Sequence, residues 1–409
     1  MKTRVLAVGL ALLLALSGCA DFLDPGATEE TAETEEGEEE QQRAAADVGE
    51  PVPSLSEYYR SIFPDGEYEA GEVRGFTSGE GCYSGTAYNR LDLERLEIGL
   101  SEIVSETFPP EDYFIQEGQY IGSDEMNAWL ARYEESDEDD EEEYAGLGLN
   151  PQLEEGDGFE DQHSNHPCVL SHVVEQNYHT ENDDGDLQLG GVGVALSLNS
   201  IYYFREQDED GSYGSWFDEE ISEEEAIESG EEMAAEVVNR LRSDEREEGI
   251  LNDVPIVISL FREAPRNSIT PGEFIATATA EAGSDLGSWE TLNEEHYFFP
   301  SDRAFDHVPE DAERFNQFTE ALNSYFRNHI GVTARGHYQS NELDRLSIEV
   351  PIRFHTKTET IAVTQQAASE VEEHFPTDID ISLTVTTNDR TEALITRESG
   401  EEVNVHIYE

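Results

Sequence analysis

Four residues near the start of the chain, Leu16-Ser17-Gly18-Cys19, could direct the covalent attachment of a lipid. They close a short apolar run that begins at residue 5 and follows two basic residues. This order is typical of a secretory signal peptide, and the apolar run is too short to span a membrane as a helix. Because a cysteine at the junction can be diacylated, we expect cleavage between Gly18 and Cys19 and a lipid-anchored chain facing the cell exterior. The alternative is an ordinary signal peptide in which the cysteine has no role.

A second group of residues could bind a metal, because it combines four histidines with a cysteine: His163, His166, Cys168, His172 and His179. Imidazole and thiolate at such spacings can hold zinc or copper. The only other cysteine of the mature chain besides Cys19 is Cys82, and outside the membrane two such thiols more often form a disulfide. A disulfide between Cys82 and Cys168 is therefore the favoured hypothesis, with free thiols or a metal site as alternatives. In the favoured case the histidines are exposed or structural, and no cofactor is expected.

Other patterns that could do chemistry do not complete a motif. The serine of GCYSG at 81–85 lies one position away from where a G-x-S-x-G elbow needs it, and the sequence has no HExxH and no phosphate-binding glycine loop. Two acidic stretches with glycine, at 182–185 and 208–211, lack the glutamate that a calcium loop requires at its twelfth position. We therefore expect no catalytic residue, no specific metal site and only nonspecific cation binding.

Charge is the strongest feature of the composition. The chain has 94 acidic and 23 basic residues, a formal net charge of -71, and its only lysines are Lys2 and Lys357. Repulsion of this size destabilises a compact state at low ionic strength, but in molar salt the Debye length falls to about 3 Å. The composition therefore indicates adaptation to concentrated brine. It argues against a nucleic-acid partner, because phosphate binding needs the opposite charge.

The composition also divides the chain into four parts. After the signal peptide at 1–18, residues 19–52 are acidic and of low complexity, which predicts a disordered tether. The remainder is rich enough in Phe and Tyr for real cores. We place an N-terminal lobe at 53–264 and a C-terminal lobe at 265–409, with the boundary near the prolines of Ala264–Pro271. A second acidic run, Glu134–Glu143, should be an exposed loop or a frayed helix end.

Hydrophobic periodicity predicts an α+β fold of two α+β lobes with mixed sheets. The predicted helices are Asp92–Phe108, Asp124–Tyr133 with Ser123 as N-cap, Ser222–Arg242, Glu310–Phe326 and Ile361–His374. The predicted strands are Val192–Phe204 (one strand or a pair), Val254–Phe261, Phe274–Glu281, Leu346–Phe354, Ile379–Thr386 and Val403–Tyr408. The order strand, helix, strand occurs twice, which indicates either a repeated unit or only how common such units are.

Several uncommon strings occur along the chain in a fixed order: NRLD (89–92), YFIQEGQYI (113–121), VVEQNY (173–178), LSLNSIYYF (196–204), VPIVISLFREAPRNSITPGEFIA (254–276), PIRFHTKTETIAVTQ (351–365), EALITR (392–397) and VHIY (405–408). In this order they closely resemble the CamS family, lipoproteins named as sex-pheromone precursors of Gram-positive bacteria. The resemblance covers nearly everything from about residue 55 to residue 408, plus the signal segment. The acidic expansions at 134–143 and 205–224 depart from it.

The resemblance implies a second use for the signal peptide. In named members of the family, the tail of the cleaved signal peptide is trimmed and exported as a short apolar peptide that induces conjugation in another species. The corresponding peptide here would be Leu12, Leu13, Leu14, Ala15, Leu16, Ser17 and Gly18. The alternative is a signal peptide with no second use, because any lipoprotein signal peptide yields a similar fragment. For the folded part, the resemblance supplies no catalytic residue.

Two classes of function remain open for the folded lobes. The first is a noncatalytic binding or interaction module, held at the membrane through Cys19, whose partner is a small molecule, a peptide or another surface. The second is an extracytoplasmic enzyme whose carboxylate site is hidden among the 94 acidic residues. An enzyme should show converging buried carboxylates with raised pKa values in a cleft, whereas a deep groove with few ionisable groups favours binding.

Overall fold

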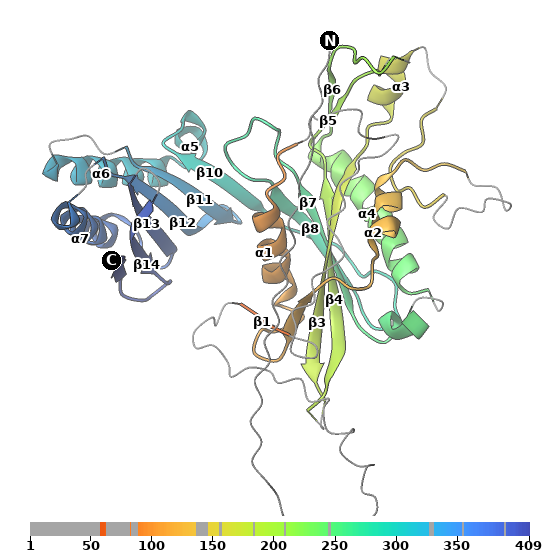
Figure 1. Ribbon diagram of the computed structural model, residues 1–409, viewed down its shortest axis with the longest axis horizontal. Coiled ribbons are helices and arrows are strands. Elements are labelled where there is room, and N and C mark those ends of the chain that lie inside the picture. The colour runs from red at the N-terminus through yellow and green to blue at the C-terminus, as the bar shows by residue number, and fades with distance from the viewer. Residues whose placement is uncertain are drawn as a thin grey trace, which may run out of the picture. The chain divides into compact units, whose positions relative to one another are not determined.

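Two main β-sheets run through the part of the chain that the structure describes (Figure 1). The computed structural model describes residues 58–62, 82, 89–135, 146–154, 158–182, 185–207, 210–243, 247–326, 331–353, 356–387 and 390–409. The predicted signal peptide, Cys19, the tether and most of the acidic run at 134–143 lie outside these residues. The mixture of helices with sheets that contain both parallel and antiparallel pairs confirms the predicted α+β class.

The first sheet has seven strands in the order β1-β2-β3-β4-β7-β8-β9. They are β1 (Arg60–Ser61), β2 (Phe114–Glu117), β3 (Leu170–Glu181), β4 (Leu187–Leu198), β7 (Ile256–Arg262), β8 (Glu273–Ala280) and β9 (Glu290–Thr291). A separate hairpin of β5 (Ile201–Phe204) and β6 (Phe217–Glu220) follows β4. The predicted strand at 192–204 is therefore the pair β4 and β5, which lie in different sheets.

The second sheet has six strands that follow one another in chain order, β10 to β15. They are β10 (Glu294–Phe299), β11 (Thr333–Gln339), β12 (Glu342–Pro351), β13 (Asp380–Thr387), β14 (Arg390–Arg397) and β15 (Asn404–Ile407). Three of them, β10, β11 and β14, are absent from the sequence prediction. Two of these, EEHYFF and TARGHYQ, place charged residues among aromatic ones, which hides the apolar alternation of a strand.

Seven α-helices lie between the described strands: α1 (Leu93–Val104), α2 (Ser123–Leu130), α3 (Phe159–Asn165), α4 (Glu223–Leu241), α5 (Asp302–His307), α6 (Pro309–Tyr325) and α7 (Lys357–His374). A short 3-10 helix covers Glu247–Asn252. The N-cap of α4 is Ser222, whose side chain accepts from the amide of Glu225 while the Glu225 carboxylate accepts from the amide of Ser222. Ser123, the expected N-cap of α2, is instead its first residue, and Gly122 occupies the cap position.

The two sheets share the same central topology. In the first, β3-β4-β7-β8 pair as antiparallel, parallel and antiparallel neighbours, and in the second β11-β12-β13-β14 do the same. The parallel pair is joined through α4 in the first sheet and through α7 in the second. Both predicted strand–helix–strand units are therefore present, and each sits at the centre of its sheet.

The helices cover these two sheets differently. Helices α1 and α4 lie on opposite faces of the first sheet, because α1 packs on Ala195 and Val257 whereas α4 packs on Leu196 and Ile258 of the same strands (Figure 1). Helices α6 and α7 instead contribute to one core on a single face of the second sheet. The burial of β12 alternates accordingly, and its other face carries polar side chains.

Two glycines of β4 allow α1, and the turn that follows α1, to pack closely against the first sheet. A Cβ at Gly191 would lie 2.2 Å from the ring of Phe108, and one at Gly193 would lie 3.0 Å from Val104. The string VGVALSL therefore places branched side chains toward α4 and small residues toward α1.

The change from one sheet to the other comes later than the expected lobe boundary. The proposed boundary at 264/265 falls between β7 and β8, which are antiparallel neighbours in the first sheet. The second sheet begins only with β10 at Glu294. Prolines near residue 270 thus mark a turn within a sheet rather than a linker.

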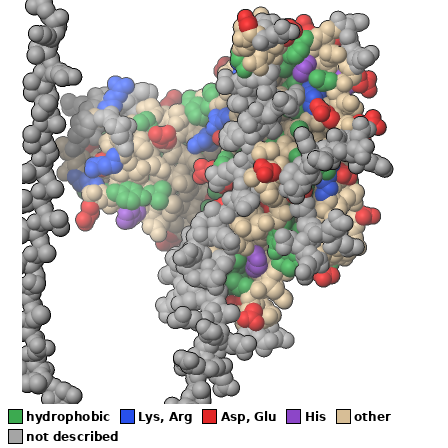
Figure 2. Space-filling view, turned by 45° about the vertical axis from the view of Figure 1, so that its right-hand side comes forward, with side chains coloured by type: hydrophobic (Ala, Val, Ile, Leu, Met, Phe, Trp, Pro, Cys, Tyr) green, Lys and Arg blue, Asp and Glu red, His purple; other side chains and the backbone are tan. Residues whose placement is uncertain are grey.

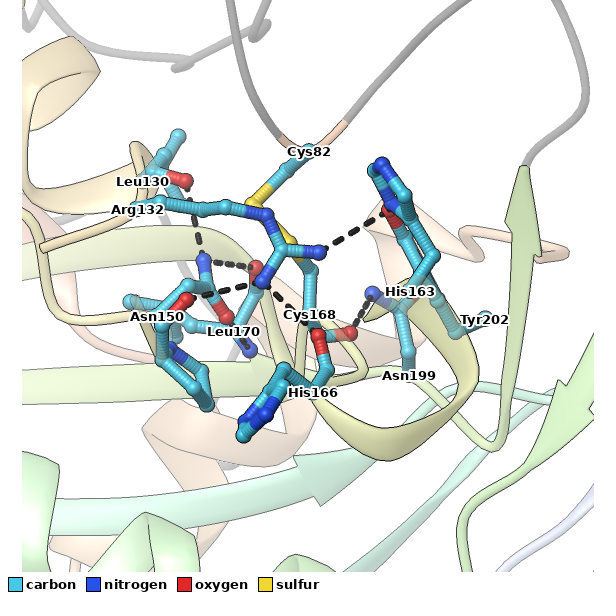
Figure 3. The surroundings of a disulfide bond; sticks show 11 residues. Cys82, Leu130, Arg132, Asn150, His163, His166, Cys168, Leu170, Asn199 and Tyr202 are labelled. Atoms are coloured by element: carbon cyan, nitrogen blue, oxygen red, sulfur yellow. Dashed lines mark hydrogen bonds between the residues drawn. A yellow bond between two sulfur atoms is a disulfide. The ribbon is translucent and has the colours of Figure 1, made fainter. Parts of the chain in front are cut away.

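A disulfide joins Cys82 to Cys168, just before β3, with a Cα–Cα distance of 5.7 Å. The buried side chain of Asn150 lies nearby, donates to the carbonyls of Leu130 and Leu170 and accepts from the Leu170 amide (Figure 3). Asn199 donates to the carbonyl of Cys168 itself. The bridge therefore links Cys82 to the buried, hydrogen-bonded segment that leads into β3 of the first sheet.

In the stretches that the structure describes, no helix has the length and apolar character needed to cross a membrane.

Removing the disulfide should destabilise the first sheet. The two cysteines are 86 positions apart, and a loop of this length constrains the unfolded chain by up to about 4 to 5 kcal/mol, often less in practice. We expect Cys82→Ala to lower the free energy of unfolding, measured by denaturant titration, and to abolish any effect of added reductant. A nonreduced digest should yield one peptide pair linked through Cys82 and Cys168. Quantitative alkylation of both thiols in the unreduced native protein would contradict the bridge.

Candidate functional site: a charged pocket beside helix α1

The histidines singled out in the sequence do not come together. His163 is buried, hydrogen-bonded to the hydroxyl of Tyr202 at 2.8 Å and stacked on Phe204. Burial, with a smaller contribution from the charge of Arg132, lowers the pKa of His163 to about 4. His166 lies 4.0 Å from the carboxylate of Glu154. Among the described residues, no group of three metal-ligating side chains includes any of these histidines.

His172 takes part in an arrangement that superficially resembles a catalytic triad. Its Nδ1 lies 2.7 Å from the hydroxyl of Ser171 and 2.9 Å from the buried carboxylate of Glu263, which also accepts from Ser197. In a triad the carboxylate and the nucleophile must contact opposite ring nitrogens. Because both contact Nδ1 here, this cluster lacks the geometry to activate a serine.

The buried carboxylate of Glu175 is also structural. It accepts hydrogen bonds from the backbone amides of Tyr120 and Ile121 and from the side chain of Asn177. Burial raises its pKa, although these hydrogen bonds act in the opposite direction. The strings YFIQEGQYI and VVEQNY thus meet to hold one carboxylate inside the first sheet, away from the pockets described below.

A cluster that the sequence analysis missed lies at the first residue of the second sheet. Oε1 of Glu294 is 2.7 Å from Nε2 of His296 and 3.2 Å from Nε2 of His337. The same oxygen accepts from Nε of Arg95 at 2.7 Å, and Oε2 accepts from the amide of Phe274 at 2.8 Å. The carboxylate is therefore contacted from α1, β8, β10 and β11.

The network extends from Arg95 along α1 to the second sheet. Glu102 accepts from Arg95 at 2.7 Å through one oxygen and from Arg345 of β12 at 2.8 Å through the other. On the far side of His337, its Nδ1 lies 3.1 Å from Asp344. Two arginines, two histidines and three carboxylates thus alternate across the contact between α1 and β10-β11-β12.

Glu294, His296 and His337 are the one group among the described residues that could supply three ligands to a metal ion. The position of Arg95 argues against a metal site. Its guanidinium already contacts the oxygen that a metal would need, and it places a fixed positive charge beside the site. We interpret the cluster as a buried charge network in which Arg95 supplies the cation.

The network shifts the pKa of its members in different directions. Burial alone raises the pKa of Glu294, but its contacts with His296 and His337 and the charge of Arg95 outweigh burial and hold that pKa well below its usual range. Burial lowers the pKa of His296 despite its bond to Glu294. Burial also opposes protonation of His337, but its contacts with Asp344 and Glu294 raise its pKa overall.

A pocket of about 230 Å³ opens beside this network. Its lining includes Asp92, Glu94, Arg95, Ile98, Pro271, His296, Arg335, Gly336, His337, Arg345 and Ser347. The three arginines are notable in a chain whose acidic residues outnumber its basic ones about four to one, and acidic side chains are scattered over the face seen in Figure 2. Of the two carboxylates in the lining, Asp92 pairs with Arg90 at 2.7 Å.

A second, larger pocket of about 510 Å³ continues along the uncovered face of the second sheet. Its lining is Ile269, Phe298, Thr333, Ala334, Arg335, Ser347, Ile348, Glu349, Ser382, Thr384 and Thr386. The two pockets share Arg335 and Ser347, so we describe them together as the trough. Five side chains with hydroxyl groups line the trough, and most of its charged groups gather at the end beside α1.

Sequence reasoning missed this site because its residues come from distant segments of the chain. Glu294, His296 and Phe298 alternate with the core residues Tyr297 and Phe299, which is the pattern of a half-buried strand. Recognising that alternation would have identified β10 and its outward histidine. The partner of Glu294, Arg95, is 199 positions away, and no spacing rule could connect them.

Comparisons with known proteins agree with the fold. The family described as CamS sex pheromone cAM373 precursor matches residues 68–403. The crystal structure of a sex pheromone precursor from Lactobacillus salivarius subsp. salivarius UCC118 is similar, with a TM-score of 0.72 and 27% identity over 87% of this chain and 97% of that one. The structure of the C-terminal domain of the sex pheromone staph-cAM373 precursor from Staphylococcus aureus has a TM-score of 0.65 and 28% identity over 77% of this chain and 96% of that one. No curated protein matches the chain.

Substitution of the two histidines should produce opposite dependences on pH. The pKa of His337 is raised in the folded state, so its stabilising contribution is present below about pH 6.5 and is lost as pH rises through the folded pKa. The pKa of His296 is lowered, so its neutral form contributes above about pH 6.5 and this contribution is lost as pH falls.

We therefore expect His337→Gln to cost more stability at about pH 5.5 than at about pH 8.5, and His296→Gln to cost more at about pH 8.5. Urea unfolding of both variants in constant high salt measures the two differences, and each variant serves as the control for the other. If both substitutions cost more stability at the same pH, the network does not shift the pKa values of the two histidines in opposite directions.

Proposed function

The chain belongs to the CamS family of sex pheromone cAM373 precursors, and we propose that it is an extracytoplasmic lipoprotein whose folded part binds a ligand without catalysing a reaction. The observation that carries the anchoring is the sequence Leu16-Ser17-Gly18-Cys19 after an apolar run. Cys19 would carry the lipid, and residues 19–52 would hold the folded part away from the membrane. Its partner would be a small molecule, a peptide or another surface.

The trough supports binding rather than catalysis. Its polar lining consists of hydroxyl groups, three arginines, two histidines and the carboxylates of Asp92, Glu94 and Glu349. Glu294, the buried carboxylate beside it, has a lowered pKa and four fixed contacts, so it is held as an anion rather than poised to accept a proton. Glu273, whose pKa burial raises to about 7, does not line either pocket. Nothing in the described residues pairs two proton-transferring carboxylates in the trough.

The name of the family, sex pheromone cAM373 precursor, also suggests a role for the cleaved segment. We propose that Leu12–Gly18 is released as a short apolar peptide after cleavage at Cys19. The peptide has no charged side chain, which suits an apolar receptor groove.

Cys19→Ser tests the anchoring and the release of the peptide together. The wild-type protein should partition into the detergent phase with a mass that lacks residues 1–18 and includes the lipid, and Leu12–Gly18 should be detectable in the medium by mass spectrometry. The variant should remain uncleaved or enter the medium without lipid, and it should yield no peptide. Ser17→Ala keeps a small residue before the cut and should behave as wild type. A wild-type protein that is secreted in soluble form without lipid would contradict the proposal.

We further propose that the acidic composition adapts the folded part to high salt. Dialysis of the mature protein from molar to millimolar salt should abolish cooperative unfolding, because repulsion among its excess carboxylates is then unscreened. Circular dichroism during thermal unfolding measures this loss, and restoring the salt should reverse it. An unchanged transition at about 10 mM salt, where the Debye length is about 30 Å, would rule out this adaptation.

A further inference from the structure

We infer that the trough on the second sheet binds the phosphate group of a small soluble molecule, held by Arg335 together with the hydroxyls of Ser347 and Ser382. This inference rests on the proposed ligand-binding role of the folded part and names the chemistry of the ligand. It concerns the uncovered face of the sheet, which α6 and α7 leave free because both pack on the opposite face.

The three groups form one row across adjacent strands. Arg335 of β11 is the register partner of Ser347 of β12, and Ser347 is in turn the partner of Ser382 of β13. Register partners on neighbouring strands point to the same face, and in an antiparallel pair such as Arg335 and Ser347 their Cβ atoms lie about 4.5 to 5.5 Å apart. Neighbouring positions of the same strands, Ala334, Ile348 and Leu383, lie in the core on the other face, so this row faces the trough.

These groups have donors to spare. Within the described part of the chain, no hydrogen bond or ion pair engages the side chain of Arg335, Ser347 or Ser382, although the other two arginines of the trough are both paired with carboxylates. An exposed arginine without a carboxylate is unexpected in a chain with 94 acidic residues. The absence of a partner leaves the guanidinium fork available to an incoming anion.

The number and arrangement of donors favour phosphate over carboxylate. A planar carboxylate needs only the guanidinium fork, whereas a tetrahedral phosphate has further oxygens that the two serine hydroxyls can reach. Arg95, Arg345 and His337 lie at the adjoining end of the trough, but Glu102, Glu294 and Asp344 balance their charges. Arg335 therefore supplies the guanidinium that a ligand can reach. Three carboxylates of the trough oppose binding. Asp92 and Glu94 lie at the end beside α1, and Glu349 lines the same pocket as the two serines, where it accepts from Thr386 at 3.4 Å.

The test uses the mature lipoprotein in a phosphate-free and sugar-free detergent at constant high ionic strength. Inorganic phosphate is the probe, and its binding is followed by broadening of its phosphorus-31 resonance as the protein is titrated. Arg335→Gln should weaken binding about tenfold or more, because it removes charged hydrogen bonds. Arg353→Gln is the matched control, since it removes the same charge from an exposed position outside the trough and should bind as wild type. Glu349→Gln should bind more tightly than wild type.

Competition separates this inference from its rivals. If acetate displaces phosphate and binds more tightly than phosphate does, the site is a carboxylate site and the phosphate assignment is wrong. Equal binding of phosphate by the Arg335→Gln and Arg353→Gln variants would also overturn it. A wild-type protein that enters the detergent phase but does not broaden the phosphate resonance would overturn the inference while leaving the membrane anchoring intact.

Discussion

The arrangement around the second sheet depends on the buried carboxylate of Glu294. Glu294 is the first residue of β10. Its two oxygens contact the amide of Phe274 in the first sheet and the guanidinium of Arg95 in α1. They also contact the ring nitrogens of His296 and His337. A buried carboxylate is costly unless it is paired and hydrogen-bonded, so each of these contacts constrains the others. One charge thereby connects the first sheet, its helix and two strands of the second sheet, and it fixes the polar end of the trough.

The difference between the two sheets explains why the trough lies on the second sheet. Their four central strands have the same topology, but α1 and α4 cover both faces of the first sheet, and α6 and α7 cover only one face of the second. The first sheet accordingly has apolar or small residues on both faces of β4 and β7. The second sheet alternates, and its free face carries Arg335, Ser347 and Ser382. Repetition of the fold therefore does not imply repetition of the site.

The sequence predicted the parts of the fold that leave a local signal. Val254–Phe261 is apolar at every position but Ser259 and contains most of the central strand β7. The compartment inferred from Cys19 favoured the disulfide that joins Cys82 and Cys168. Prediction from the sequence failed where segments distant along the chain surround a residue. Nothing near Glu294 in the sequence indicates that its charge is buried, because Arg95 and Phe274 reach it only in the folded chain. The lobe boundary was misplaced for a related reason: prolines mark turns, and a turn inside a sheet has the same composition as a linker.

The shared topology has a consequence for the order in which the two halves of the chain fold. In the first sheet the central parallel pair aligns Val192 with Ile256, whereas in the second it aligns Arg345 with Asp380, at little more than half that separation along the chain. Closing a longer loop costs more chain entropy before its contacts form, so the second sheet has the lower contact order at its centre. The parallel pair at the centre of the first sheet should therefore form more slowly than the one at the centre of the second. The apolar strands β4 and β7 of the first sheet therefore stay exposed longer during folding than the corresponding strands β12 and β13.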